Sequence, residues 1–289
     1  MSTDPAVEAY LRGDPNIGPG DVFPDLDDYD LADVDLDQAS PELLARVALR
    51  RHRLLDRDAL DHMPPPEPLI EGVLGRRGLA MKAGSRGLGK TLTALDWAGH
   101  VATGLPSWYG HQVAVHGPVL FIALEGFHGI PERVRAWEIH HGRRMTNVHW
   151  WPDPIDLRLR RDAKMIGSVA RHLGAVLLIG DSVRATGAGK EDTADMGAYV
   201  TGLETIRTIY DGLTLVLHNS GWDGTRERGS TLLPDACDTT LLLQGDPEGI
   251  RTLKLKWPRL PGRSGCGGCD HAAVSVWGPA GPVRACWVS

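Results

Sequence analysis

The sequence contains few cysteines and no long hydrophobic segment. Only four of its 289 residues are cysteines: Cys237, Cys266, Cys269 and Cys286. Thiols so few and so clustered exclude the disulfide scaffold of a small secreted domain and favour a reducing compartment. No apolar run approaches the ~20 residues of a membrane-spanning helix, and the first residues lack the basic and apolar regions of a secretory signal. We therefore expect a cytoplasmic protein without a membrane partner.

Basic residues are nearly absent from the first part of the chain. Residues 1–42 hold twelve acidic residues and a single basic one, Arg12, so they carry a charge of −11 against −6 for the whole chain. The remainder is therefore mildly basic, at +5. The acidic part is polar, dense in charge and interrupted by prolines, which predicts a largely disordered segment over residues 1–63. This segment is a solvated tail, a decoy for nucleic acid or a dock for a basic partner.

Strand-like and helix-like segments alternate from Pro64 onward. Apolar, strand-like runs cover residues 119–124, 148–151, 175–179 and 213–218, and helical patterns cover 130–141, 162–173 and 193–210. This alternation predicts an α/β domain over residues 64–260, with a mostly parallel sheet covered by helices on both faces. Two further strand-like runs, DTTLLLQ and RTLKLKW, are separated by the short turn GDPEG, which predicts an antiparallel hairpin added to the sheet. Residues 261–289 form a tail with glycines and cysteines.

A glycine-rich motif follows the first strand-like run of this domain. Gly84 is followed after four residues by Gly89, Lys90 and Thr91, the spacing of a phosphate-binding loop. Its glycines let the chain turn so that several backbone N–H groups converge on phosphates. Lys90 would reach the β and γ phosphates of a nucleoside triphosphate, and the Thr91 hydroxyl would hold Mg²⁺. The predicted phosphate-binding residues are Gly84, Ser85, Arg86, Gly87, Leu88, Gly89, Lys90 and Thr91.

The segments on either side of this motif favour phosphate binding over an ordinary turn. Upstream, RRGLAMKAG reads as a short buried strand that ends at the loop. Downstream, residues 91–103 predict a helix whose N-terminal dipole favours phosphate. Its buried face is expected to consist of Leu92, Leu95, Ala98, Val101 and Ala102. A glycine-rich turn before an ordinary helix is the alternative.

Three further polar residues stand at the ends of strand-like runs. Asp181 ends the run AVLLIGD, Glu125 follows VLFIAL, and His218 ends LTLVLH. Ligands of open α/β sheets bind at the carboxyl ends of the strands. We expect Asp181 near the metal, Glu125 to orient and deprotonate the attacking water, and His218 to contact the γ phosphate. An aspartate that starts a surface loop and a merely packed histidine are the alternatives.

These residues, in this order, carry a family resemblance over residues 64–257. The motifs are PPPEPLIEGVLGRRGLAMKAGSRGLGKT, GLPSWYG, GPVLFIALEG followed by Arg133, LLIGDSVRATGAGKEDTADMGAYV, LVLHNSGW and RGSTLLPDACDTTLLL. The chain resembles the RepA-type hexameric replicative helicases and the related RecA-like P-loop ATPases of phages and plasmids. The resemblance implies a RecA-like fold over residues 64–260.

The same resemblance implies roles for individual residues. Lys90 and Thr91 match the phosphate-binding Lys and the Mg²⁺-binding Thr, Glu125 the catalytic Glu, and Asp181 the metal-linked Asp. His218 matches the first His of a paired-histidine motif. The Arg228-Gly229-Ser230 run matches an Arg-Gly-Ser turn of the family.

The sequence departs from the family at several positions. Gly180 replaces a bulky apolar residue just before the aspartate, and Asn219 and Ser220 replace the His-Thr that usually follows His218. Asp238 lies in the neighbourhood where RepA carries an arginine that reaches into the next subunit. No arginine finger is therefore assigned in that neighbourhood.

Two lysines in LKLKWPR offer a substitute for that arginine. Lys254 and Lys256 alternate on one strand face, where DnaB-like relatives carry a basic pair that completes the ATP site of the neighbouring subunit. We expect this pair to act in trans, with a solvated strand face as the alternative.

Two loops that leave the predicted catalytic strands carry cations and one aromatic residue. The first contains Arg184 and Lys190, and the second contains Trp222, Arg226 and Arg228. Cations suit phosphates and an indole suits base stacking, so both loops are predicted to bind single-stranded DNA. Acidic residues in both loops leave ordinary solvated turns open.

The tail contains one C-x-x-C motif. Cys266 and Cys269, with His271 and Cys286, would complete a tetrahedral zinc site. Strong zinc signatures contain two C-x-x-C motifs, and this tail contains one. We therefore favour a flexible turn with free thiols over zinc binding.

Together, the residues and the resemblance predict an ATP-dependent DNA motor. The expected ligands are ATP and Mg²⁺, and the expected partners are single-stranded DNA, further copies of the chain in a ring, with a hexamer expected, and replication proteins at the acidic segment. A RecA- or RadA-like recombination or repair ATPase is the alternative. A P-loop kinase of a small metabolite is a second one, although no arginine-rich lid follows the Asp181 strand.

Overall fold

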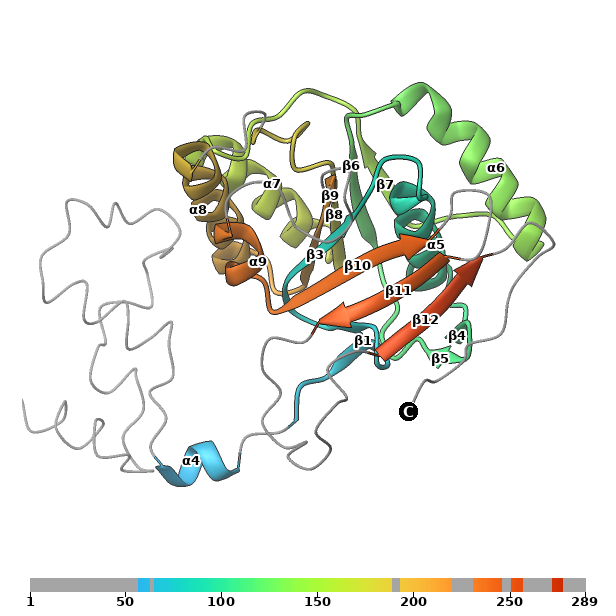
Figure 1. The fold of residues 1–289 in the computed structure, drawn as a ribbon, viewed down its shortest axis with the longest axis horizontal. Coiled ribbons are helices and arrows are strands. Elements are labelled where there is room, and N and C mark those ends of the chain that lie inside the picture. The colour runs from blue at the N-terminus through green and yellow to red at the C-terminus, as the bar shows by residue number, and fades with distance from the viewer. Residues whose placement is uncertain are drawn as a thin grey trace, which may run out of the picture. The chain divides into compact units, whose positions relative to one another are not determined.

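The structure is a computed structural model that describes residues 57–62, 65–188, 193–219, 231–245, 251–256 and 272–277. The chain divides into two units between Pro65 and Pro66. The described part of the first unit contains helix α4, Arg57–Asp61. The second unit contains the sheet and the helices that surround it (Figure 1).

An eight-stranded sheet organises the second unit. Six strands run parallel in the order β10-β3-β9-β8-β6-β7, and β11 and β12 continue the sheet beyond β10 in antiparallel fashion. The strands are β3 Gly78–Gly84, β6 Val119–Ala123, β7 Val148–Trp151, β8 Leu177–Asp181, β9 Leu213–Asn219, β10 Thr239–Gly245, β11 Arg251–Lys256 and β12 Ala272–Trp277. The predicted α/β class and the added hairpin are confirmed, whereas β12 was not predicted.

The central strands are buried on both faces, which explains their continuous apolar runs. Every residue of β6 and β8 is buried. Successive side chains of a strand point to opposite faces: in β9, Leu215 and Leu217 belong to one hydrophobic core and Val216 belongs to the other. Two cores, one on each face, therefore hold the sheet between layers of helices.

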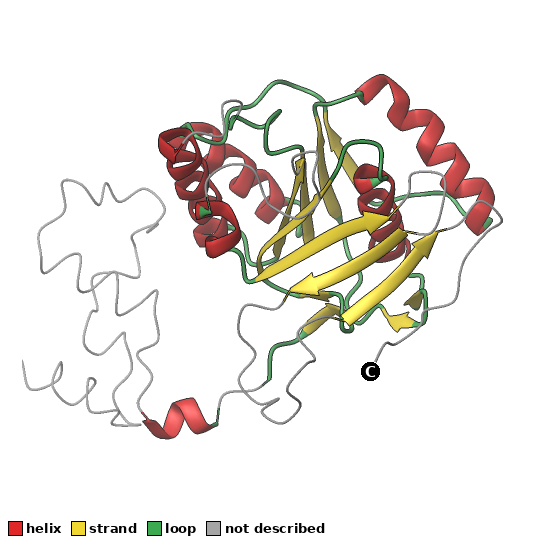
Figure 2. Ribbon diagram, viewed as in Figure 1, coloured by secondary structure: helices red, strands yellow, loops and turns green. Residues whose placement is uncertain are grey.

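Helices cover both faces of the sheet, as predicted (Figure 2). The first core includes side chains of α5 (Lys90–Thr103) and α6 (Ile130–His141). The second core includes side chains of α7 (Arg160–His172), α8 (Thr193–Ile209) and α9 (Leu232–Ala236). A short 3-10 helix, η2 (Phe127–Gly129), precedes α6. Among the described residues, no helix combines the length and the apolar character needed to cross a bilayer.

One residue of the predicted buried face of α5 is exposed. Leu95, Ala98, Val101 and Ala102 are buried, but Leu92 is 36% exposed. Leu92 lies in the first turn of the helix and lines a cavity beside the glycine-rich loop. Helical periodicity predicted burial there, and the prediction is wrong because the first turn projects beyond the core.

Two small hairpins lie outside the main sheet and were not predicted. Strand β1 (Pro68–Ile70) pairs with β2 (Leu74–Gly75), and β4 (Ser107–Trp108) pairs with β5 (His111–Gln112). Their strands have only two or three residues, too few for a recognisable alternation. The second hairpin places the Trp108 ring edge-on to Trp97 of α5, with ring centroids 5.4 Å apart.

Candidate active site

The glycine-rich loop leaves the carboxyl end of β3 and enters α5. Gly87 and Gly89 have φ angles of 86° and 87°, in the left-handed region that glycine adopts without strain. At Gly84 the reason is space, because a Cβ atom there would lie 2.8 Å from the backbone oxygen of Leu243 on β10. The loop therefore has the strand–loop–helix setting that its sequence predicts.

Lys90 begins α5 and its side chain folds back over the loop. The Lys90 Nζ donates hydrogen bonds to the backbone oxygens of Gly84 at 2.7 Å and of Ser85 at 3.0 Å. Burial lowers the pKa of Lys90 to about 8, although the carboxylates of Asp181 and Glu125 act in the opposite direction. The loop's own carbonyls thus hold a cation in the place where phosphates would contact it.

A second lysine, Lys82 of β3, supports the loop from within the core. Its side chain is completely buried, its Nζ donates to the backbone oxygen of Lys90 at 3.2 Å, and it lies 4.3 Å from the ring centroid of Trp97. Burial is the main reason that the pKa of Lys82 is well below its usual value, and the charge of the nearby Lys90 lowers it further. Sequence reasoning placed Lys82 in a buried strand without a role, because strand alternation does not reveal what lies beneath a loop.

Thr91 and Asp181 meet at the mouth of the loop. Asp181 ends β8, and the Thr91 Oγ1 donates to its Oδ2 at 2.7 Å. Burial raises the pKa of the Asp181 carboxyl and the nearby Glu125 raises it further, against the Thr91 hydrogen bond and the charge of Lys90. A hydroxyl and a carboxylate are hard oxygen donors of the kind that Mg²⁺ prefers. The pair fits the predicted metal site.

Glu125 lies just beyond the end of β6, the strand next to Asp181. Strand β6 pairs in parallel with β8, with Ala123 opposite Asp181, and Glu125 follows two residues later, before Gly126 at φ 65°. The Ser182 Oγ donates to the Glu125 Oε1 at 2.9 Å. Ser182 was not predicted as a site residue. Its position directly after Asp181 was a signal, but its partner depends on which strand lies beside β8.

His218 and Asn219 end β9, the strand between β8 and β3. His218 pairs with Ala83, and Asn219 pairs with Gly84 at the start of the phosphate loop. His218 is buried, and Asn219 is one of the residues that line the nucleotide cavity. The His218 backbone thus lies at the strand end that the sequence predicts, and the residue that faces the nucleotide side is Asn219.

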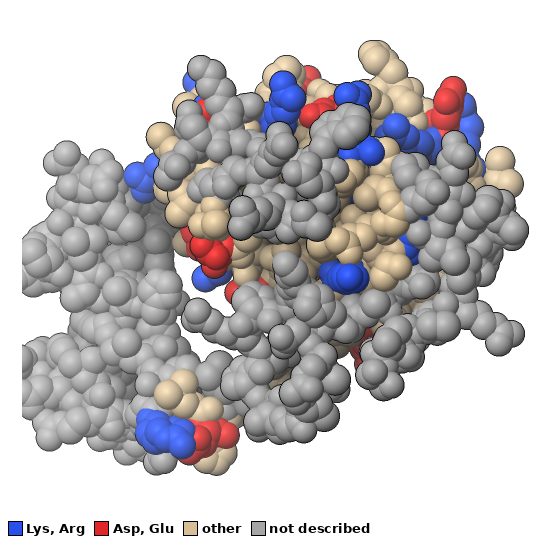
Figure 3. All heavy atoms as spheres, in the orientation of Figure 1, with Lys and Arg blue, Asp and Glu red and all other residues tan. Residues whose placement is uncertain are grey.

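Several of the groups described above, among them Lys90, Thr91 and Asp181, line one cavity of about 1100 Å³. Figure 3 shows Lys and Arg side chains along the upper part of the described surface, near α6 and the loop that enters α5. Arg133 of α6 and Arg184 are cavity residues whose role at the nucleotide was not predicted. The lining residues are Ser85, Arg86, Gly87, Gly89, Lys90, Thr91, Leu92, Glu125, Gly126, Arg133, Asp181, Arg184 and Asn219.

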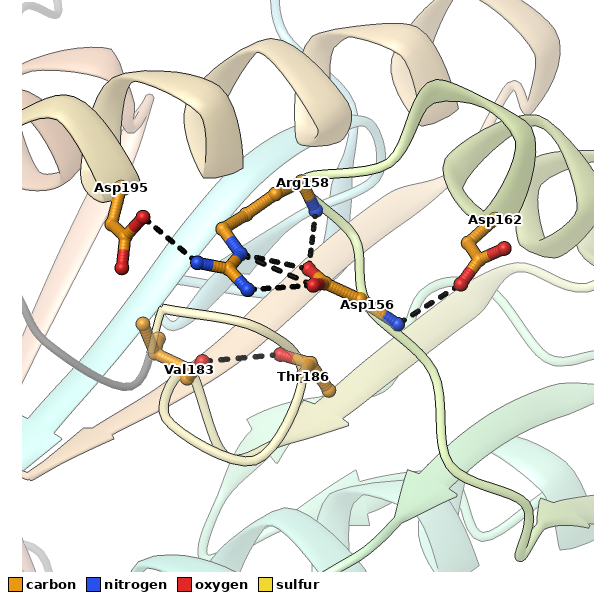
Figure 4. Close-up of polar contacts among 6 residues, drawn as sticks. All are labelled: Asp156, Arg158, Asp162, Val183, Thr186 and Asp195. Atoms are coloured by element: carbon orange, nitrogen blue, oxygen red, sulfur yellow. Dashed lines mark hydrogen bonds and ion pairs between the residues drawn. The ribbon is translucent and has the colours of Figure 1, made fainter.

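The described part of the loop after Asp181 is tied to its surroundings. The Thr186 Oγ1 lies 2.8 Å from the Tyr199 hydroxyl, and the Leu157 N–H donates to the Thr186 oxygen at 2.8 Å. Next to it, Arg158 binds Asp156 and reaches Asp195 at the start of α8 (Figure 4). A Cβ atom at Gly180 would be in ordinary van der Waals contact with the Val216 Cγ1 at 3.6 Å and the Thr186 Cγ2 at 4.0 Å.

Asp238 lies away from the cavity. Its Oδ2 accepts a hydrogen bond from the Leu79 N–H at 2.8 Å, at the amino end of β3. The cavity is at the opposite, carboxyl end of that strand. Asp238 therefore anchors the start of the phosphate-loop strand.

The structure locates only part of the predicted DNA, trans-acting and zinc residues. Lys254 is half-buried on β11, where it pairs with Leu242 of β10 and Ala273 of β12, and Lys256 ends the same strand. The residues outside the described part are Lys190, Trp222, Arg226, Arg228, Arg259, Cys266, Cys269, His271 and Cys286.

The arrangement defines a class of protein. A phosphate loop joins β3 to α5, an aspartate ends β8, and a glutamate follows β6, with β9 between β3 and β8 and β6 beside β8. These are the parts of a P-loop ATPase with a RecA-like fold. Residues 45–225 match the family model AAA_25, described as an AAA domain, and the chain belongs to this family.

Solved structures of other proteins resemble the chain, and one of them is a recombinase. A crystal structure of the RadB recombinase is 16% identical to the chain, with a TM-score of 0.49, and the match covers 70% of this chain and 88% of that one. No curated protein sequence matches the chain.

Proposed function

We propose that this ATPase couples ATP hydrolysis to movement on single-stranded DNA as a replicative helicase of identical subunits, with a recombination or repair ATPase as the second candidate. The observation that carries the ATPase part is the convergence of Lys90, Asp181 and Glu125 on one cavity. A cation for phosphates, a metal-binding carboxylate and a base are the groups that phosphoryl transfer to water requires.

Each residue has a distinct chemical task in this proposal. The backbone N–H groups of the loop and the Lys90 ammonium bind the β and γ phosphates. Thr91 and Asp181 would hold Mg²⁺, which, when bound, neutralises charge on those phosphates. Glu125, oriented by Ser182, positions water and takes its proton. Arg133 and Arg184 supply further positive charge at the cavity wall.

The proposed coupling to DNA rests on two neighbouring strand ends. Asp181 of β8 lies opposite Leu217 of β9, so the loops that follow both strands begin side by side at the cavity. A change of contacts around the γ phosphate would act on both loops together. The second loop contains Trp222, Arg226 and Arg228, which suit stacking and phosphate contacts. Arg184, in the first loop, also lines the nucleotide cavity.

The first experiment measures the ATPase rate with and without single-stranded DNA. A DNA motor is expected to hydrolyse ATP several-fold faster with DNA, and Glu125→Gln is expected to lower both rates by ~100-fold or more. A kinase of a small metabolite would not respond to DNA. An ATPase rate unchanged by DNA would contradict the proposal.

The second experiment tests the loop after His218. Trp222→Ala is expected to cost about 1–3 kcal/mol of DNA affinity per stacked base, a loss that persists at high salt. Arg226→Ala and Arg228→Ala should each reduce the slope of log K against log salt by about 1. Arg171→Ala, an exposed arginine at the end of α7, is the matched control and should change neither quantity. Unchanged DNA affinity in all three variants removes this loop from the proposal.

Electron microscopy of the protein with ATP and DNA separates the two candidates. Closed rings support a helicase, and filaments along DNA support a recombination or repair ATPase.

A further inference from the structure

Three metal-ligating side chains meet between α5 and α6, away from the nucleotide cavity. Asp96 and His100 lie one turn apart on α5, and His141 is the last residue of α6. One carboxylate oxygen, the Asp96 Oδ1, is 3.2 Å from the His100 Nδ1 and 3.4 Å from the His141 Nε2. One ligand atom from each residue lies within 4.8 Å of the other two.

Two of these separations, 3.2 Å and 3.4 Å from the Asp96 Oδ1, match the ligand spacing of a tetrahedral zinc site. With Zn–N and Zn–O distances near 2.0–2.1 Å, two tetrahedral ligands are about 3.3 Å apart. Two imidazoles and one carboxylate form a ligand set that zinc commonly takes, with water as the fourth ligand. His100 is buried, whereas the side chains of Asp96 and His141 are 20% and 19% exposed, so the cluster has an opening to solvent.

A second layer of hydrogen bonds holds the carboxylate in place. The Trp137 Nε1 donates to the Asp96 Oδ1 at 2.9 Å, and the Trp108 Nε1 donates to its Oδ2 at 2.8 Å. Gly99 makes this possible, because a Cβ atom there would lie 2.4 Å from the Trp137 ring. Outer-shell donors of this kind orient the first ligands of metal sites.

The competing explanation is a cluster held by protons alone. The His100 Nδ1 is also 2.8 Å from the backbone oxygen of Asp96, so an N–H at that atom would satisfy the cluster without an ion. Zinc would take the lone pairs of the His100 Nδ1 and the His141 Nε2, so a neutral ring would carry its proton on the other nitrogen and the hydrogen bonds of the proton-held cluster would be lost. Metal binding is therefore measurable against the proton-held cluster.

We propose that Asp96, His100 and His141 bind one zinc ion that ties α6 to α5. Helix α5 begins with Lys90, and α6 carries Arg133 to the cavity wall. The ion would thus fix the distance between two cationic parts of the nucleotide site without touching the nucleotide.

The test uses the full chain with Cys266, Cys269 and Cys286 changed to serine, so that the tail thiols cannot compete for zinc. Excess Mg²⁺ occupies the oxygen ligands of the nucleotide site. Zinc affinity is measured by competition with a chromophoric chelator, and Co²⁺ is added separately to record its visible spectrum. His141→Asn removes a ligand, and His140→Asn is the matched control at the exposed neighbouring residue.

The parent and His140→Asn are expected to bind one equivalent of zinc, to give a tetrahedral Co²⁺ spectrum, and to unfold at a higher temperature with zinc. In His141→Asn the affinity should fall by about 100-fold or more, since outer-shell partners alone account for 10- to 100-fold. His100→Asn provides a second variant in case one fails to fold, as judged by circular dichroism. A parent that binds no zinc, or folded ligand variants that bind it as tightly as the parent, would overturn the proposal and leave the proton-held cluster.

Discussion

At the scale of single residues, the hydrolytic role of Glu125 is the most direct prediction. Glu125→Gln keeps the shape of the side chain and removes the base, so ATP should bind with unchanged affinity while hydrolysis falls by ~100-fold or more. Calorimetric ATP binding and single-turnover hydrolysis measure the two effects separately. If the Gln variant hydrolyses ATP at the parent rate, Asp181 becomes the candidate base.

Ser182 is expected to act through Glu125. Ser182→Ala removes the hydrogen bond to the Glu125 Oε1, and kcat should fall by about 10-fold with KM unchanged, the scale of a hydrogen bond to a charged group. In the Glu125→Gln background the same change should add little, because the positioned group is already lost. Ser168→Ala, at an exposed serine of α7, is the control. Additive losses would mean that Ser182 contributes independently of Glu125.

The lowered pKa of Lys90, about 8, links ATP binding to pH. Phosphates next to Lys90 favour its charged form and raise this pKa, so ATP binding at pH 8.5 should take up protons, and ATP affinity should fall as the pH rises through about 8. Calorimetry in two buffers with different ionisation enthalpies measures the uptake.

The same shift has a defined effect on folding. Between the pKa of about 8 in the folded state and ~10.4 in the unfolded chain, the unfolded chain binds more protons, so Lys90 makes stability rise with pH in that window. Lys82→Met is the control for both effects, because it removes the other buried lysine near the loop. Loss of proton uptake in Lys82→Met would assign the proton to Lys82.

At the scale of elements, α8 packs closely on the backbone of residue 157, and this packing sets how much two glycine-to-alanine substitutions on α8 change the stability. A Cβ atom at Gly202 would lie 1.8 Å from the Leu157 oxygen, whereas at Gly197 the nearest atom, of Leu232, is 3.9 Å away. Gly202→Ala should therefore lower the free energy of unfolding by about 1–3 kcal/mol or more. Gly197→Ala, on the same helix, should raise it by up to ~1 kcal/mol through helix propensity. Urea unfolding compares the two. Equal stabilities would show that α8 does not contact residue 157 in solution.

At the scale of the whole molecule, the question is whether a neighbouring subunit completes the ATP site. If Lys254 and Lys256 act in trans, a variant with both changed to alanine should bind ATP and assemble but hydrolyse slowly, because the γ phosphate loses a stabilising charge. Mixing it with Lys90→Ala subunits should partly restore activity, since some interfaces then pair an intact Lys90 with an intact lysine pair. Steady-state ATPase assays of defined mixtures measure this.

The control for the mixing experiment is Lys164→Ala, at an exposed lysine of α7, which should leave activity unchanged. If the assembled double variant hydrolyses ATP at the normal rate, Lys254 and Lys256 have no role in hydrolysis and only form a solvated strand face. The search for a trans-acting cation would then move to Arg226, Arg228 and Arg259.

The sequence by itself determined those features that depend on neighbours along the chain. Glycine spacing identified the phosphate loop, and local periodicity predicted α6 and β7 with the bounds that the structure has. Apolar runs ending in an acid placed Asp181 and Glu125 at strand ends. Each of these signals arises within a few residues, because backbone geometry and side-chain period are local properties.

Only the tertiary structure decided which strand ends lie next to one another. With β9 between β3 and β8, and β6 beside β8, Ser182 reaches Glu125 and Arg184 faces the nucleotide cavity. Tertiary packing also places Lys82 beneath the phosphate loop and brings Asp96 of α5 to His141 of α6. These contacts join residues that are eight to more than fifty positions apart, and their partners are set by strand order and helix packing, which no local pattern records.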